Sequence, residues 1–168
     1  MREMRGQFQK LFRTEQGIKF FGELNNPLKA EQENKYRTRR ILNVSKKALV
    51  TTGDVVTADE ASYLVSLAAE YTDMRQFKAY PITHRLNWTR REDTIDTVTG
   101  IPRDNTLVIL SPALPVVVEY GESVDNLNLE TEKYRVFTGS DVRVGDQLGA
   151  WLVRSKLQVN GLNMLEVS

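Results

Sequence analysis

Apolar and polar residues alternate with a period of two along two neighbouring stretches in the middle of the chain. Residues 63–71 form the first stretch and residues 76–89 the second. Period-two alternation is typical of strands that are buried on one face. The segment 72–75 between them has about hairpin length. We therefore predict an antiparallel pair of strands. Their apolar faces would carry Tyr63, Val65, Leu67, Ala69 and Tyr71, and Tyr80, Ile82, His84, Leu86 and Trp88.

A second pattern is a short sequence motif that occurs twice. Residues 50–56 contain Gly53-Asp54 between apolar residues and precede an aromatic-Leu-Val triplet at 63–65. Residues 142–148 contain Gly145-Asp146 and precede the same type of triplet at 151–153. Glycine accepts positive φ, and an aspartate side chain can bond to nearby backbone, so each Gly-Asp pair predicts a structural turn between short strands.

The remaining sequence predicts further short strands and only one helix. Phe8, Leu11 and Phe12 have helical spacing, and Gly17 would end a short helix before a strand at 18–21. Residues 90–105 predict a long connection, and the prolines at 112 and 115 predict a break or an edge. Asn160-Gly161 predicts a tight hairpin. The fold class is all-β, a small antiparallel barrel or sandwich. Other predicted strands are 107–110, 116–120, 126–129, 134–137, 157–159 and 162–167.

Charge divides the chain into a basic beginning and an acidic end. Residues 1–47 have 12 Lys and Arg against 5 Glu, a net +7, whereas residues 92–168 have 6 basic and 12 acidic residues, a net −6. We expect an irregular basic segment at 1–47 and a β-rich domain at 48–168. Opposite charges at the two ends would attract another copy or a polyanion, or neutralise each other within one molecule. The candidate contacts to a partner or to DNA are Lys35, Arg37, Arg39, Arg40, Lys46 and Lys47.

Composition narrows the class of protein. The 168 residues fit one domain, or one domain with an extension. The chain has no cysteine, which excludes disulfides and thiolate zinc sites. No apolar run approaches the roughly 20 residues of a membrane span, and the first residues are not those of a secretory signal. We expect a soluble protein.

Candidate catalytic chemistry is sparse. His84 is the single histidine, and its place in an alternating strand predicts a core or half-buried residue rather than a metal ligand. Asp54 and Asp146 occupy repeated turn positions, which favours a role in the turns over acid-base catalysis. The glycines have neither P-loop nor dinucleotide spacing. We predict no catalytic residue, no cofactor and no metal site, and expect that the chain is not an enzyme.

The order of these short strands and turns resembles the small β-rich neck proteins of tailed bacteriophages. The resemblance covers roughly residues 50–168, from Gly53-Asp54 through Leu86-Asn87-Trp88 to Gly145-Asp146 and Gly161-Leu162. The pattern is similar to head-closure, or stopper, proteins of the head-to-tail connector. The resemblance implies a virion structural protein made in the host cytoplasm. Its copies would form a ring between the portal complex and the tail, contact portal, adaptor and tail proteins, and help to retain packaged DNA. The basic first third departs from the compact pattern.

A β-barrel that binds single-stranded nucleic acid is the alternative. Such a barrel would stack bases on aromatic rings of an exposed sheet face, with arginines close by. The aromatic candidates share their face with Ile82 and Leu86, however, which favours burial. The residues in question are Tyr63, Tyr80, Trp88, Arg85, Arg90 and Arg91.

Overall fold

The computed structural model describes residues 9–25, 39–121 and 133–168, which form twelve strands and no helix. The all-β prediction is therefore confirmed for this part of the chain, and the strands close two barrels rather than one. The first barrel contains β1 (Gln9–Thr14), β2 (Lys19–Asn25), β3 (Arg40–Ser45), β4 (Val55–Ala58), β5 (Ala61–Glu70) and β6 (Met74–Pro81). The second contains β7 (His84–Ile95), β8 (Pro102–Gly121), β9 (Lys133–Thr138), β10 (Gln147–Leu148), β11 (Trp151–Val159) and β12 (Leu162–Val167).

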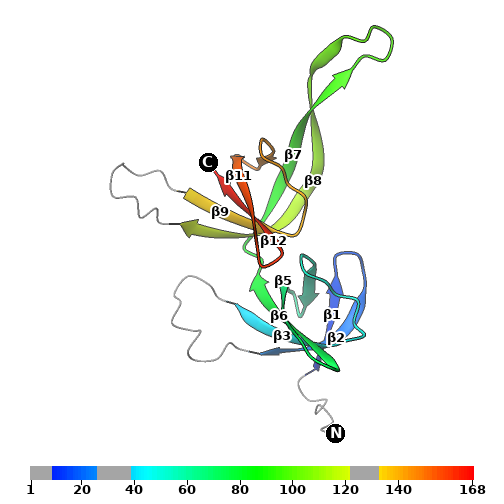
Figure 1. Cartoon of the computed structure of the whole chain (residues 1–168), viewed down its shortest axis with the longest axis vertical. Coiled ribbons are helices and arrows are strands. Elements are labelled where there is room, and N and C mark those ends of the chain that lie inside the picture. Colours follow the sequence, from blue (N-terminus) through cyan, green and yellow to red (C-terminus); the bar gives the residue numbers. More distant parts are fainter. Residues whose placement is uncertain (1–8, 26–38, 122–132) are drawn as a thin grey trace.

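The two barrels have the same connectivity. Around the first, the strands follow the order β1-β2-β3-β6-β5-β4, and around the second β7-β8-β9-β12-β11-β10. All pairings are antiparallel, and pairing of β4 with β1 and of β10 with β7 closes each barrel. The chain thus uses one arrangement of six strands twice in succession (Figure 1).

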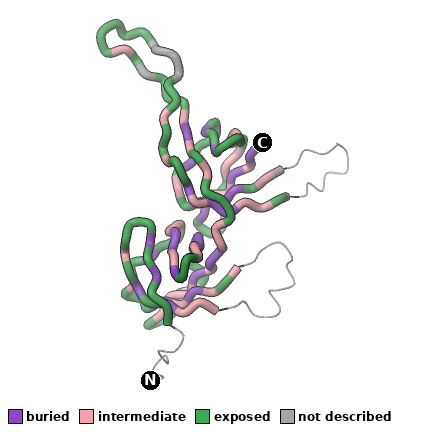
Figure 2. Tube along the Cα trace, turned by 180° about the vertical axis from the view of Figure 1, so that it is seen from behind, coloured by how far each residue is buried: buried purple, intermediate pink, exposed green. Residues whose placement is uncertain are grey.

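Each barrel surrounds its own apolar core, because alternate residues of every strand point inward. Buried residues occur in both barrels (Figure 2). They are mainly aliphatic and aromatic residues on paired strands. The first core includes Phe12, Phe20, Leu42, Val44, Val65 and Phe77, and the second includes Val116, Val136, Val142, Leu148, Val153 and Leu165.

The two Gly-Asp motifs form equivalent turns in the two barrels. Gly53 and Gly145 have φ of +95° and +93°, the left-handed region that a type II turn requires at its third residue. Each turn is followed by the short strand that closes its barrel. The matched hydrogen bonds are Asp54 N to Thr51 O, 3.2 Å; Asp146 N to Arg143 O, 3.1 Å; Gly53 N to Val65 O, 2.8 Å; and Gly145 N to Val153 O, 2.9 Å.

A third apolar cluster joins the barrels. It combines Val55, Leu64 and Tyr80 of the first barrel with Val117, Phe137 and Leu162 of the second. Close backbone contact accompanies it, since a Cβ on Gly139 would overlap the carbonyl oxygen of Gly53. The Ser66 hydroxyl also donates to the backbone carbonyl of Asn160 across this contact. Burial of these side chains holds the two barrels against each other.

The beginning of the chain differs from the sequence-based expectation. Residues 9–14 form β1 instead of a short helix, because Phe12 and Thr14 point inward and Leu11 and Arg13 outward in a hairpin with β2. Gly17, with φ of +87°, lies in the hairpin turn. The strands β1, β2 and β3 complete the first barrel, so the division lies between Pro81 and His84 instead of at 47/48.

Three expectations for the middle of the chain need correction as well. The predicted pair of strands exists as β5 and β6, but the alternation at 80–88 continues across the junction of the barrels, and His84 begins β7. The predicted connection at 90–105 is largely strand, in β7 and β8. Pro112 does not end β8, because the strand bulges there and continues. The predicted Asn160-Gly161 hairpin is confirmed, with φ of 52° and 77°.

Candidate interaction surface

The β7–β8 hairpin extends well beyond the second barrel (Figure 1). We call residues 90–108 the arm; it includes the paired positions from Arg90 and Val108 to Ile95 and Pro102, and the turn between them. β7 pairs with β10 only at Trp88 and Thr89, so the arm has no neighbouring strand on that side among the described residues. The corresponding β1–β2 hairpin of the first barrel closes with a short turn. The arm is therefore an addition that barrel closure does not require.

Exposed residues predominate at the tip of the arm (Figure 2), and several of the exposed residues are apolar. Val98 at the tip is 91% exposed, and Ile95 and Ile101 on either side of it are exposed too. Near the barrel, Leu107 and Ile109 project from one face of β8 and are also exposed. Apolar residues grouped in this way on a projecting hairpin make the arm a candidate contact surface.

The tip has a defined turn. Asp96 Oδ1 accepts hydrogen bonds from the backbone N–H groups of Val98, at 2.8 Å, and Thr99, at 3.3 Å. The backbone N–H of Asp96 donates to the Ile101 carbonyl at 3.0 Å, and that of Gly100 to the Asp96 carbonyl at 2.8 Å. An aspartate at the start of a turn satisfies backbone donors in this manner and fixes the loop. The arm consequently presents Val98 on an ordered support.

A buried ion pair holds the root of the arm. Arg90 donates from Nε to Asp146 Oδ1 and from its terminal nitrogen to Oδ2, both at 2.8 Å. Asp146 Oδ2 also accepts from Trp88 Nε1 at 2.8 Å and from the backbone N–H of Arg143 at 2.9 Å. The Asp146 side chain is only 3% exposed. A bidentate Arg–carboxylate pair adds a defined geometry to the charge attraction. The pair therefore links β7 to the second Gly-Asp turn.

The ionisation of this pair reflects its surroundings. Burial alone would raise the pKa of Asp146, but the hydrogen bonds from Arg90, the Arg143 backbone and Trp88 outweigh it and leave the pKa below its ordinary value. The hydrogen bond to Asp146 is also the main reason why the pKa of Arg90 is raised. Both groups are therefore charged at neutral pH.

The first barrel carries a groove of about 560 Å³, lined by residues of β2, β3 and the neighbouring turns. Phe20, Phe21, Val44, Ala48 and Met74 supply its apolar lining, and Lys47 and Asp73 its charges. Phe21 is 62% exposed and lies directly opposite Leu11, which is exposed on β1. The groove and this pair form a second exposed apolar surface. We call it the β2 groove.

The predicted contact residues divide into three groups. Lys35 and Arg37 lie outside the described residues. Arg40 is exposed on β3, where it pairs with Ala79, and Arg39 precedes it. Lys46 forms an ion pair with Glu70 at 3.5 Å, and Lys47 lines the β2 groove. The described residues therefore place Lys47 on a candidate surface.

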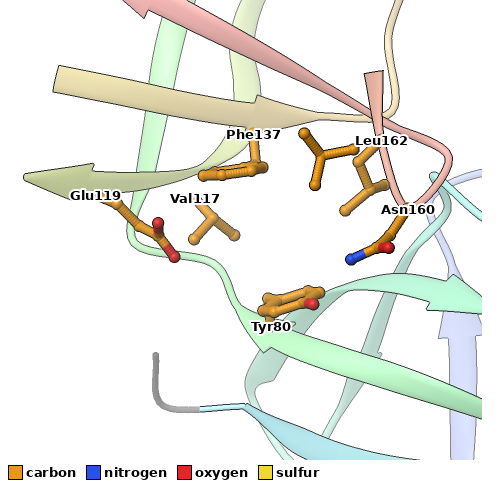
Figure 3. Close-up of a pocket in the computed structure, with 7 residues that line it drawn as sticks. Tyr80, Val117, Glu119, Phe137, Asn160 and Leu162 are labelled. Atoms are coloured by element: carbon orange, nitrogen blue, oxygen red, sulfur yellow. The ribbon is translucent and has the colours of Figure 1, made fainter. Parts of the chain in front are cut away.

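A small cavity lies between the barrels (Figure 3). Tyr80 faces Val117, Phe137 and Leu162 across it, and Glu119 and Asn160 are at its rim. Its volume is about 10 Å³, the space of a single water molecule. The cavity is a packing defect of the barrel contact and has no room for a substrate.

The single histidine of the chain is His84. His84 is exposed, contrary to expectation; its Nδ1 lies 2.9 Å from the Thr83 hydroxyl and its ring packs edge-on against Trp151. Over the described ranges, no three His, Asp or Glu side chains gather in a metal-binding group. No helix suited to cross a membrane occurs in that same part of the chain.

Sequence reasoning did not single out residues 90–108 as a projecting hairpin with exposed apolar residues. Apolar residues there lack regular alternation, because both faces of the hairpin are exposed and neither needs to match a core. The sequence feature that could have drawn attention to the arm is Arg90, two residues after Trp88. In the structure, both side chains bind Asp146.

Comparison of the chain with known protein families, with curated proteins and with solved structures finds no match.

Proposed function

We propose that the chain is a non-enzymatic structural protein of the bacteriophage neck, of the head-closure type. Copies of it form a ring between the portal complex and the tail and help to retain packaged DNA. The proposal begins from the resemblance of residues 50–168 to such proteins. The observation that carries it in the structure is the arm, a rigidly rooted hairpin with exposed apolar residues that projects from two closed barrels.

Closed barrels and a projecting arm suit a subunit that must pack side by side without uncontrolled aggregation. Closure pairs the strand edges of both barrels, on which chains would otherwise pair indiscriminately. The arm then concentrates exposed apolar surface in one place. Contact with neighbouring subunits or with portal and tail proteins would bury it.

The nucleic-acid-binding alternative receives less support from the placement of its aromatic residues. Tyr63 and Tyr80 are each only 8% exposed and belong to apolar clusters. The Trp88 indole is engaged with Asp146 and Arg90. Rings in these places do not offer a stacking platform for bases.

The test is the native mass of the purified full-length chain at low and high salt, with electron microscopy of any assembly. We expect rings, formed by the chain alone or on the isolated portal complex of its phage. A chain that stays monomeric and does not bind that complex would contradict the proposal. Salt-sensitive binding to a single-stranded oligonucleotide under the same conditions would instead favour the alternative.

A further inference from the structure

The arm and the β2 groove, two exposed apolar surfaces of the described residues, lie on different barrels. The arm projects from the second barrel, away from the first (Figure 1). The residues that line the β2 groove belong to the first barrel. The arm root is fixed by Arg90 and Asp146, and the barrels are fixed to each other by the shared apolar cluster. The arm of one molecule therefore cannot fold back onto the groove of the same molecule.

The surfaces are also matched in chemistry. The tip offers the aliphatic side chains of Ile95, Val98 and Ile101, all exposed. The groove offers the exposed ring of Phe21 and a hollow of about 560 Å³ beside it. Branched aliphatic groups that fill a hollow beside an aromatic ring bury apolar area on both partners.

Charged side chains flank both surfaces. Exposed Glu92 and Asp93 precede the tip and Arg91 stands before them, while the groove contains Lys47 and Asp73. Each surface thus carries both signs at the rim of an apolar centre. An arrangement of this kind orients partners and selects among them more than it adds affinity.

We propose that the arm of one copy docks in the β2 groove of the next copy. The contact is heterologous, since it joins different surfaces of identical chains. Repetition of such a contact gives a closed ring when the rotation per subunit divides a full turn, and an open filament when it does not. The proposal deepens the proposed function, on which it rests for the ring itself.

The chain has no cysteine, so introduced cysteines report contacts without background. The test mixes two full-length variants, Val98→Cys at the tip and Phe21→Cys at the groove, under mild oxidation. We expect a disulfide-linked pair in the mixture and little linkage in either variant alone. The matched control replaces Phe21→Cys with Leu157→Cys, an exposed position on β11 of the other barrel, and should give little linkage.

A second variant measures the contribution of the tip to assembly. Val98→Asp places a charge where the groove would bury it, and the position is so exposed that the fold should not change. We expect a reduction of at least about tenfold in the association constant, which corresponds to about 1.4 kcal/mol. Val144→Asp, at another exposed apolar position, should associate as the parent does.

The outcomes separate this inference from the proposed function. Rings that form without linkage between positions 98 and 21, or strong linkage of Val98→Cys to itself, would refute the arm-to-groove contact and leave the neck proposal standing. Open filaments that show linkage between positions 98 and 21 but do not bind the portal complex would support the arm-to-groove contact. They would contradict the neck proposal. A chain that shows no linkage, remains monomeric and does not bind the portal complex would overturn both.

Discussion

At the level of single residues, equivalent positions of the two barrels have acquired different partners. Asp54 accepts hydrogen bonds from the backbone and the hydroxyl of Thr51, within its own turn. Asp146 accepts from the equivalent backbone position and also from Arg90 and Trp88. The second turn therefore does more than reverse the chain, because it holds the strand that becomes the arm.

The first prediction compares these two carboxylates. Asp146→Asn should lower the free energy of unfolding at neutral pH by about 2–3 kcal/mol, because it leaves Arg90 without its buried counter-charge. Asp54→Asn, the matched control at the partly exposed turn, should cost about 1 kcal/mol. Chemical denaturation monitored by circular dichroism measures both. Equal losses would show that the Arg90 pair adds nothing to stability.

The same pair predicts a dependence on pH. The pKa of Asp146 is lower in the folded chain than in the unfolded chain, so its contribution is complete above the unfolded pKa of about 3.9. It is lost as the pH falls below that value and through the folded pKa. The difference in stability between the parent and Asp146→Asn should therefore shrink below about pH 4. A difference that stays constant in acid would contradict the ion-pair explanation.

A third prediction concerns glycines that support the turns and the barrel contact. Gly145→Ala should cost about 1 kcal/mol through left-handed strain, since its Cβ would meet no neighbour. Gly139→Ala should cost more, about 3 kcal/mol, because its Cβ would overlap the Gly53 backbone. Thermal unfolding of the two variants checks the order. A milder effect at Gly139 would mean that the barrels separate easily.

At the level of elements, the sequence predicted most strands but not their grouping. Alternation identified β5 and β6, and the Gly-Asp and Asn-Gly turns were visible because special backbone angles restrict the residue type. The first barrel was missed because Phe8, Leu11 and Phe12 fit a helical spacing, and only the hairpin with β2 selects the strand. Lys47 could be named as a contact candidate from charge, but the groove beside it depends on distant strands.

A fourth prediction tests whether the arm is separable from its barrel. Replacing residues 91–107 by Asn-Gly would connect the paired residues Arg90 and Val108 by a tight hairpin, as β1 and β2 are connected. We expect a melting temperature close to that of the parent, and loss of self-association in native-mass measurements. Unfolding of this variant would show that the arm stabilises the barrel, and unchanged association would exclude the arm from assembly.

At the level of the whole molecule, the apolar cluster between the barrels couples two domains of the same topology. Leu64 and Leu162, one from each barrel, are almost fully buried in it. An interface of apolar side chains and close backbone contact favours unfolding as one unit. The relative orientation of the arm and the β2 groove then stays fixed, as a repeating contact requires.

The fifth prediction uses the position of the two tryptophans, Trp88 and Trp151, both in the second barrel. Fluorescence thus follows the second barrel alone, whereas circular dichroism follows both barrels. In the parent we expect coincident unfolding transitions from the two signals. Leu162→Ala should cost about 2–5 kcal/mol and separate the transitions, because it leaves a gap in the shared cluster. Separate transitions in the parent itself would contradict the coupling.

The matched connectivity also has a consequence for protein engineering. In the second barrel, the connection between the first two strands is extended into the arm, and the six strands still form a closed barrel. The equivalent connection of the first barrel, around Gly17, is short, and a Cβ at Gly17 would touch nothing within 4 Å. This turn should accept a foreign hairpin as the second barrel accepts its own. The turn around Gly17 is therefore an insertion site for displaying a peptide on the first barrel, whose first two strands carry no projecting arm.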